Sequence, residues 1–189
     1  MRIGVFGGSF DPPHAAHLAV ARAAFQQLNL DRILWVPALQ TPHKDVSSTP
    51  FDHRIGMVRA LVGGEPGTEV SEIESTLSSP SYTLHTLNAL KLRMEGNHSW
   101  HLIIGADNWA IFQSWHQPES VLKEASLAVY PRQGFALTGL PTDATVLDCP
   151  EIAMESRQFR ALLQSNPEWA LAELPVSVAS YIRLHRLYQ

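Results

Sequence analysis

Residues 3–17 read IGVFGGSFDPPHAAH, and this stretch decides the fold. It begins with an apolar run that contains β-branched residues, which is typical of a buried parallel strand. Gly7 and Gly8 follow directly, and glycine lets backbone N–H groups approach a ligand closely. Pro12 and Pro13 suit the start of a helix, where a missing N–H costs little. The order of strand, glycine turn and helix predicts a phosphate-binding turn at the carboxyl end of a strand.

His14 and His17 lie three residues apart at the predicted helix start, so they share one face of that helix. Two imidazoles there can donate hydrogen bonds to a polyphosphate and stabilise charge that develops at phosphorus. Surface or capping histidines are the alternative, which would be preferred for a lone histidine. The glycines, prolines and strand in front favour the catalytic interpretation. The stretch has neither a Walker A sequence nor the three-glycine dinucleotide fingerprint.

Further apolar runs bounded by turn residues predict the rest of a sheet. Strands are expected at 33–36, 102–104 and 127–130, with weaker candidates at 68–73 and 145–149. Helical periods lie between them, at 18–28, 55–62 and 84–90, and a last helix is expected with Pro175 in its first turn. Strands that alternate with helices predict an α/β fold, a doubly wound parallel sheet with right-handed connections and a small C-terminal helical part.

Composition limits the class of protein. The chain has 189 residues, 45% of them hydrophobic and 17% charged, so we expect one folded domain over 1–189. Cys149 is the only cysteine, which excludes an intramolecular disulfide and a cysteine-based zinc site. A formal net charge of −4 argues against a general nucleic-acid binder. We see neither a secretory signal nor a run long enough for a membrane span, so a cytoplasmic protein without a membrane partner is expected.

The stretch 7–17 resembles the G-[ST]-F-D-P-x-H-x-G-H signature of the nucleotidyltransferase superfamily. In that superfamily the two histidines bind the phosphates of ATP and stabilise direct attack at the α-phosphorus, without a covalent enzyme intermediate. The resemblance implies a Rossmann-like nucleotidyltransferase fold with His14 and His17 as catalytic residues. It also assigns Gly7, Gly8, Ser9 and Phe10 to the ATP site, together with the two histidines. The superfamily usually has glycine where Ala16 stands, and we expect this small residue to have a modest effect.

Two later segments resemble bacterial nicotinate-nucleotide adenylyltransferases, which join ATP to nicotinate mononucleotide. Residues 37–44 are similar to the P-x-x-x-P-P-H-K loop, which implies that Lys44 neutralises phosphate charge; a solvated loop lysine is the alternative. Residues 80–83, Pro-Ser-Tyr-Thr, imply a site for the nicotinate carboxylate at Ser81, Tyr82 and Thr83. Ser81 or Thr83 could instead cap the helix that follows, and both roles are compatible.

The segment 103–108 is similar to the family's I-I-G-x-D sequence. There Gly105 admits the nucleotide, and Asp107 binds ribose hydroxyls because a carboxylate accepts two hydrogen bonds. A helix N-cap is the alternative role for Asp107. The resemblance also places Trp115 where the family stacks an aromatic ring on the pyridine. Ser9 and Asp107 are assigned to both the ATP site and the mononucleotide site.

Two segments complete the predicted ATP site. Residues 132–135 resemble R-x-G-[YF] and contribute Arg132, while 154–160 resemble I-S-S-[ST]-x-[IL]-R and contribute Ser156 and Arg160. Serine can cap a helix and reach a phosphate, and a guanidinium suits the β and γ phosphates. Glu155 and Arg157 replace small hydroxyl residues, and a carboxylate beside triphosphate repels it unless it faces away or meets a cation. The closing segment 174–188 also matches the family, which we interpret as packing without a chemical role.

The resemblance implies ATP and nicotinate mononucleotide as substrates and Mg²⁺ bound mainly through the ATP phosphates, with no protein metal ligand. A transition-metal site of His14, His17 and His43 is less economical than a shared phosphate role. The chain could form a homo-oligomer. One alternative is another adenylyl or cytidylyl transferase, such as pantetheine-phosphate adenylyltransferase, from which 80–83 and Trp115 distinguish it. A non-catalytic nucleotide-binding regulatory module is the other, suggested by Ala16, Glu155 and Arg157.

Overall fold

The computed structural model describes residues 1–40, 49–149 and 155–189. Within them a sheet of parallel strands has the order β3-β2-β1-β4-β5-β6. The strands are β1 (Arg2–Gly8), β2 (Arg32–Pro37), β3 (Thr68–Val70), β4 (Ser99–Gly105), β5 (Ser126–Tyr130) and β6 (Thr145–Val146). The order reverses at β1, which pairs with both β2 and β4. The predicted doubly wound α/β fold is therefore confirmed.

The strong apolar runs all form strands that extend somewhat beyond the predicted limits. The two weaker candidates are shorter than predicted. The expected strand at 68–73 ends at Val70, and a 3₁₀ turn, η1 (Ile73–Thr76), follows; the expected strand at 145–149 ends at Val146. Both are edge strands, which pair with a neighbour on one side only, so fewer backbone hydrogen bonds extend them.

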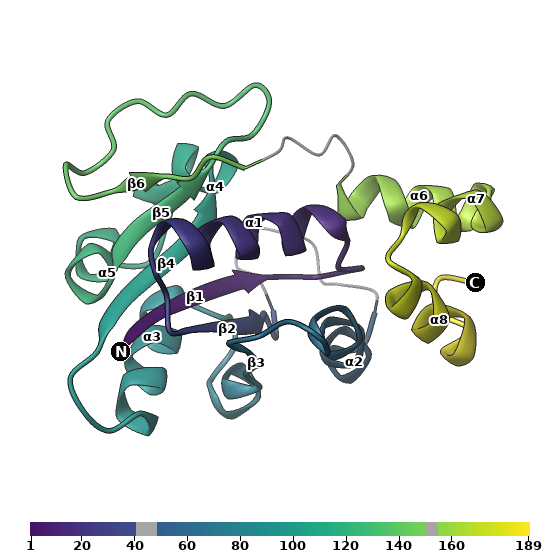
Figure 1. Cartoon of the computed structure of the whole chain (residues 1–189), viewed down its shortest axis with the longest axis horizontal. Helices are drawn as coiled ribbons and strands as arrows, with labels where there is room; N and C mark the ends of the chain where they lie inside the picture. Colours follow the sequence, from purple (N-terminus) through teal and green to yellow (C-terminus); the bar gives the residue numbers. More distant parts are fainter. Residues whose placement is uncertain (41–48, 150–154) are drawn as a thin grey trace.

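Helices cover both faces of the sheet (Figure 1). One face carries α1 (Ala15–Gln27), α2 (Phe51–Val62), α6 (Ser156–Ser165), α7 (Pro167–Glu173) and α8 (Val176–His185). The opposite face carries α3 (Thr83–Arg93), α4 (Ala106–Ala110) and α5 (Pro118–Glu124), with a 3₁₀ turn η2 (Phe112–Ser114). Successive residues of β1 face opposite ways, so Phe6 packs in the first cluster and Val5 in the second. Both faces of the strands are buried, which explains their nearly continuous apolar runs.

The predicted C-terminal helical part lies at the end of the molecule towards which β1 points (Figure 1). There α8 packs against α2. The approach is close, because a Cβ at Gly56 on α2 would collide with the Tyr181 side chain on α8. Pro175 is the residue before this helix rather than part of its first turn. The C-terminal helices thus extend the core beyond the carboxyl edge of the sheet.

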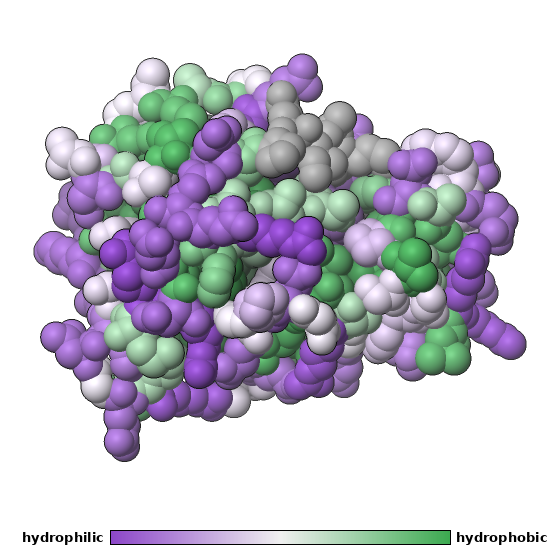
Figure 2. Space-filling model, viewed as in Figure 1, coloured by the Kyte–Doolittle hydropathy of each residue, from purple (hydrophilic) through white to green (hydrophobic). Residues whose placement is uncertain are grey.

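On the face seen in Figure 2, apolar residues gather at the upper left, over the segment between β5 and β6, and at the right, over the C-terminal helices, with many polar residues between them. Two apolar side chains of α8 are highly exposed, Val176 at 82% and Leu184 at 77%. Among the residues that the structure describes, no helix has the length and apolar character that crossing a membrane would need.

Candidate active site

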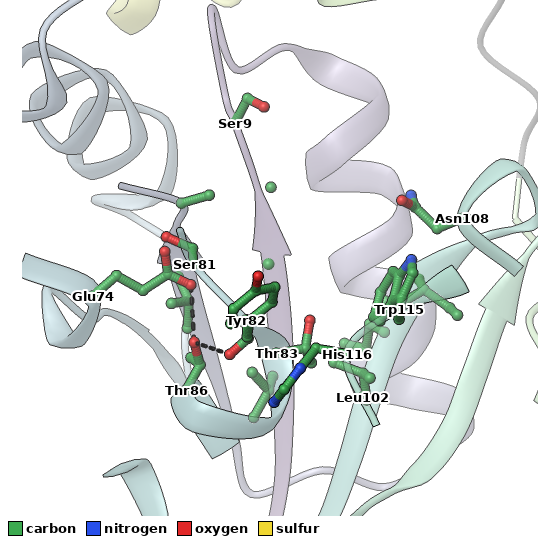
Figure 3. A pocket seen from close by; sticks show the side chains of 18 of the residues that line it. Ser9, Glu74, Ser81, Tyr82, Thr83, Thr86, Leu102, Asn108, Trp115 and His116 are labelled. Carbon is green, nitrogen blue, oxygen red and sulfur yellow. Dashed lines mark hydrogen bonds between the residues drawn. The ribbon is translucent and has the colours of Figure 1, made fainter. Parts of the chain in front are cut away.

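A pocket of about 180 Å³ opens at the carboxyl ends of β1, β2 and β4, where the strand order reverses. This is the place where open α/β sheets bind ligands. Figure 3 shows Ser9 beyond the end of β1, with Ser81 and Glu74 on one side of the strand and Trp115 and Asn108 on the other. Several of the predicted site residues line it: Gly7, Gly8, Ser9, Ser81, Tyr82, Thr83, Gly105 and Trp115.

The two predicted catalytic histidines lie together at the start of α1. His14 is the N-cap residue, and its backbone N–H donates to Nδ1 of His17 over 3.2 Å. The ring centroids are 3.9 Å apart. Because Nδ1 of His17 accepts a hydrogen bond, the proton of its neutral ring is on Nε2. The shared face that the spacing predicts is therefore present, with the tautomer of His17 fixed by the backbone of His14.

His14 is buried, with 5% of its surface exposed. Burial, with a smaller contribution from the nearby positive charge of Arg132, lowers the pKa of His14 to about 4. Its ring stacks on Phe159 of α6, with centroids 5.4 Å apart. His14 is neutral near pH 7, so it acts towards an anion as a hydrogen-bond donor and not as a cation.

Phe10 holds the loop between β1 and α1 in an unusual shape. Its φ of +48° lies in the left-handed region, which few residues other than glycine adopt. The Phe10 ring is 1% exposed and packs edge-on against Phe6, at 5.5 Å, and against His17, at 5.1 Å. Burial of this ring stabilises a backbone conformation that would otherwise be strained.

Arg54 is a buried residue that the sequence reasoning missed. It lies on α2 and is 2% exposed. Its guanidinium donates to four backbone carbonyls, those of Ser9 at 2.9 Å, Ala38 at 2.6 Å, Leu39 at 3.2 Å and Thr49 at 3.2 Å. It thereby joins the loop after β1 to the segment after β2. The available signal was its place four residues before Val58, on the apolar face of the predicted helix.

The segment Ser81 to Thr83 is fastened to the end of β2. The backbone N–H of Ser81 donates to the carbonyl of Gln40 over 2.8 Å, and the hydroxyl of Ser81 accepts from the N–H of Gln40 over 3.2 Å. Tyr82 is the N-cap residue of α3, without a side-chain capping bond, and Thr83 is the first helical residue. The capping alternative for Ser81 and Thr83 is wrong, because Ser81 uses its hydroxyl on Gln40 and Thr83 lies inside the helix.

Glu74 on η1 is a second residue that the sequence reasoning missed. It binds both the segment after β2 and the first turn of α3. Its carboxylate is buried in the pocket wall and accepts from the N–H of Leu39, at 2.8 Å, and from the hydroxyl of Thr86, at 3.0 Å. The Thr86 hydroxyl also lies 3.3 Å from the carbonyl of Tyr82 (Figure 3). A single carboxylate thus links the end of β2 to the first turn of α3.

Aromatic rings line this part of the pocket. The Tyr82 ring stacks on His116 with centroids 4.4 Å apart and an interplanar angle of 27°, and His85 meets both rings edge-on. Trp115, the predicted stacking residue, lines the pocket and packs against Phe112 at 5.0 Å. Trp109, the other tryptophan near this segment, is not part of the pocket lining, and its Nε1 donates to the carbonyl of Thr138. Sequence reasoning missed the role of His116 as the ring that stacks on Tyr82.

Arg132 joins two acidic side chains at the far side of the site. Its Nε donates to Oδ1 of Asp107 over 3.3 Å and its Nη1 to Oε1 of Glu155 over 3.0 Å. The N-cap alternative for Asp107 is wrong, because Gly105 is the N-cap residue of α4. Gly105 cannot carry a Cβ here, since it would collide with the side chains of Asp107 and Tyr130. Glu155 therefore meets a cation, and its charge is not left to repel an anionic ligand.

Ser156 and Arg160 lie against the loop after β1. The hydroxyl of Ser156 donates to the carbonyl of Pro12 over 2.9 Å, and Nη1 of Arg160 donates to the carbonyl of Asp11 over 2.5 Å. The prediction that Ser156 caps α6 is wrong, because Glu155 holds the N-cap position. Both residues stand beside the predicted ATP loop, but their described partners are backbone carbonyls of that loop.

Some predicted features lie outside the described residues. These are Lys44, His43 and the rest of the 37–44 motif after Gln40, and Met154 at the start of the last motif. The transition-metal site of His14, His17 and His43 falls among them. Within the described residues, no group of three or more histidine, cysteine, aspartate or glutamate side chains is arranged to hold a metal ion.

Comparison with known proteins identifies the family of this chain. The profile of the family described as Cytidylyltransferase-like matches residues 5–171. The chain belongs to this family. It is 34% identical over 187 residues to a probable nicotinate-nucleotide adenylyltransferase of Oceanobacillus iheyensis, covering 98% of this chain and 96% of that protein. It is 33% identical over 199 residues to a protein of the same name in Dehalococcoides mccartyi, covering 100% and 97%.

Solved structures support the same family fold. The nicotinic acid mononucleotide adenylyltransferase of Plasmodium falciparum, solved in complex with NaAD, superposes with a TM-score of 0.81 at 20% identity. The superposition covers 99% of this chain and 97% of that one. The fold shared with that enzyme therefore extends over nearly the whole chain, beyond residue 171 where the family match ends.

Proposed function

We propose that this member of the Cytidylyltransferase-like family is a nicotinate-nucleotide adenylyltransferase, which transfers the adenylyl group of ATP to nicotinate mononucleotide in NAD biosynthesis. An oxygen of the mononucleotide phosphate forms a bond to the α-phosphorus of ATP. The bond from that phosphorus to the bridging oxygen of the β-phosphate breaks, and pyrophosphate leaves. The attacking oxygen is already anionic, so no general base is needed, and catalysis consists of positioning and charge stabilisation.

One observation carries the proposal. One pocket is lined both by the loop after β1 and by the start of α3, so that two phosphorylated ligands can meet beyond the end of β1 (Figure 3). The helix start supplies backbone N–H groups that suit a carboxylate. Tyr82, Trp115 and His116 offer aromatic faces for a pyridine ring.

We assign roles to the residues on the ATP side. His14 and His17 are the catalytic residues, as neutral donors to phosphate oxygens, and the N–H groups of Gly8, Ser9 and Phe10 bind phosphate. Asp107 serves the ribose, and Arg132 approaches the phosphates once ATP displaces one of its carboxylate partners. Ser156 and Arg160 act on ATP mainly by holding the loop, since their described hydrogen bonds go to its carbonyls.

Mg²⁺ completes the proposed ATP complex. The ion would be held by phosphate oxygens and water, the arrangement it prefers in nucleotide sites, where it screens the charge of the triphosphate. The nearest protein carboxylates are already hydrogen-bonded, Asp11 to Tyr188 and Asp107 to Arg132. The residues present fit an ion carried in by the nucleotide. A homo-oligomer stays a prediction.

The rival functions receive less support from the site. The non-catalytic module was suggested partly by Glu155, but this carboxylate is neutralised by Arg132 and caps α6. A pantetheine phosphate acceptor would have no use for aromatic rings stacked beside a helix start.

The proposal is tested by pyrophosphate release from ATP and Mg²⁺ with nicotinate mononucleotide and, in parallel, with nicotinamide mononucleotide. The carboxylate accepts hydrogen bonds at both oxygens, whereas the amide turns an NH₂ donor towards the N–H groups of α3. A mismatched buried donor costs about 1–3 kcal/mol, so we expect the acid to react roughly tenfold to a hundredfold better in kcat/KM. Equal rates, or a preference for the amide, would refute the proposed substrate. No turnover with either would refute the activity.

A further inference from the structure

The C-terminal end of the chain returns to the loop that follows β1. The hydroxyl of Tyr188 donates to Oδ1 of Asp11 over 2.6 Å, a contact between residues 177 apart in the sequence. Asp11 is 2% exposed and belongs to the G-S-F-D-P stretch that precedes His14. The closing segment, which we interpret as packing, therefore also makes a polar contact with the stretch that precedes the paired histidines.

The turn that follows α8 brings Tyr188 to Asp11. α8 ends at His185, and Arg186 (φ +51°) and Tyr188 (φ +66°) both have left-handed conformations that reverse the chain. The N–H of Leu187 donates to the carbonyl of Ile182 over 3.1 Å, which closes the turn. Two left-handed residues without glycine persist only where the surrounding contacts hold them.

Side chains of α2 and α6 bind backbone carbonyls of the loop that Tyr188 contacts. Arg54 of α2 binds the carbonyl of Ser9, Arg160 of α6 that of Asp11, and Ser156 that of Pro12. The Ser9–Phe10 peptide unit is planar and trans, so fixing its carbonyl on one side directs the N–H of the same unit to the other side. Arg54 therefore aims the N–H of Phe10 away from α2. Pro12 and Pro13 have no N–H, which leaves Ser9, Phe10 and Asp11 as the donors of residues 9–13.

Asp11 is the buried acidic side chain of this loop. Besides Tyr188, Arg160 approaches it, with 3.9 Å between Nη1 and Oδ2. A buried carboxylate requires such partners, and losing one of them shifts the residue that carries it. Burial, together with the neighbouring Asp11 carboxylate, raises the pKa of Tyr188, so the phenol stays protonated and continues to donate.

We propose that Tyr188 is a positioning residue for adenylyl transfer: its hydroxyl fixes Asp11 and thereby the backbone N–H groups of Ser9 and Phe10, which receive the phosphates of ATP. The inference rests on the proposed function for the identity of the ligand. It adds a residue from the other end of the chain to the phosphate-binding loop. Small displacements of a positioned reactant are costly, and about 1 Å can reduce the rate roughly a hundredfold.

The test replaces Tyr188 by Phe, which removes only the hydroxyl, and uses Tyr181→Phe as the matched control. Tyr181 lies on α8, and its hydroxyl is 3.3 Å from Nδ1 of His53, away from the loop. We expect Tyr188→Phe to lower kcat/KM for ATP by roughly tenfold to a hundredfold. The KM for nicotinate mononucleotide should change by no more than about twofold, because Ser9 is the only residue of the loop that is assigned to its site and the start of α3 lines the rest of the pocket. A value of kcat/KM within twofold of the parent, or equal losses in both variants, would overturn the inference.

A double-mutant cycle separates positioning from a general loss of stability. Tyr188→Phe and Asp11→Asn, combined, should cost little more than the larger single change, because both break the same contact. Fully additive losses would contradict the inference. Should Tyr188→Phe melt below the assay temperature, Asp11→Asn alone carries the test, with the same expected split between the two substrates.

Failure of the proposed function would look different. In that case the parent protein itself releases no pyrophosphate, and calorimetric titration with Mg-ATP decides the inference instead. Tyr188→Phe should then bind Mg-ATP several-fold more weakly than the parent and Tyr181→Phe. Equal affinities for the three proteins would overturn the positioning role, whatever the reaction is.

Discussion

The two sides of the pocket are built in different ways. The loop at 9–14 is held by side chains from α2, α6 and the C-terminal end, which bind its carbonyls and the Asp11 carboxylate. The opposite side, at Tyr82 and His116, consists of stacked rings and an uncapped helix start. Fixed peptide planes suit phosphates, whose oxygens need donors at defined places, whereas ring faces suit a flat heterocycle that can slide. Changes to the loop should therefore affect rate more than changes to the rings.

The largest effect should come from His17→Ala, which removes a donor from the loop side. A positioned charge-stabilising donor typically contributes a factor of about 10²–10³ to kcat. Thermal unfolding should change little, because the buried stripe of α1 remains. Steady-state kinetics with saturating nicotinate mononucleotide measures the effect, and His185→Ala on α8 is the matched control. Near-normal turnover would remove His17 from the catalytic assignment.

Because of His14, the unfolding free energy of the protein should depend on pH. The pKa of His14 is about 4 in the folded protein, against 6.5 for a histidine exposed to water, so the unfolded chain binds more protons between these values. The unfolding free energy should therefore fall as the pH drops from about 6.5 to 4, by up to about 3 kcal/mol from this residue. Urea titrations across this range measure the slope, and His14→Asn should flatten it. An unchanged slope in the variant would show that other groups cause the acid sensitivity.

Arg54→Met should lower the stability of the protein, because Arg54 binds the backbone of the loop at 9–14 and of the segment after β2. The change removes the Arg54 donors from all four backbone carbonyls that this side chain binds, and unmet buried acceptors of this kind cost about 3 kcal/mol of unfolding free energy. Arg59→Met is the matched control on the same helix, because Arg59 is exposed and pairs with Glu72. Chemical denaturation measures both. Equal stability of the two variants would show that the four carbonyls do not depend on Arg54.

Thr83→Val tests the ring side and should have a smaller effect. If the hydroxyl of Thr83 contacts the nicotinate carboxylate, its loss removes one hydrogen bond, worth about 1 kcal/mol. The preference for the acid over the amide should narrow by roughly fivefold in competition assays, while kcat with the acid remains. An unchanged preference would assign the carboxylate to the backbone N–H groups alone.

The smallest effect is expected for Glu155→Ser, at the contact between Arg132 and α6. Serine can keep the N-cap role, and the exposed ion pair with Arg132 is worth at most about 1 kcal/mol. Freed from one carboxylate, Arg132 should bind ATP equally well or up to about fivefold more tightly in titration. A clear loss of ATP affinity would show that Glu155 supports the site by holding Arg132.

Local sequence patterns predicted the parts of the site that are contiguous. The apolar run before Gly7, the prolines and the paired histidines are adjacent in the chain, so their arrangement follows from strand and helix geometry alone. Arg54, Glu74 and Tyr188 could not be assigned in this way, because each acts on backbone or side chains far away in the sequence. The sequence also left open where α6 begins: the helix starts at Ser156, so Glu155 is the N-cap residue, and the serine hydroxyl donates to the distant carbonyl of Pro12.

The pairing of β1 with β4 aligns two parts of the proposed ATP site. The register pairs Phe6 with Ile103, so the loop before α1 and the turn at Gly105 emerge side by side from neighbouring strands. Because a strand advances by about 3.3 Å per residue, a slip of one residue in this pair would shift the loop against the turn by that distance. The phosphate donors of the loop and the Asp107 carboxylate would then be displaced from each other by more than the length of a hydrogen bond. The register of the sheet is therefore itself a determinant of nucleotide binding.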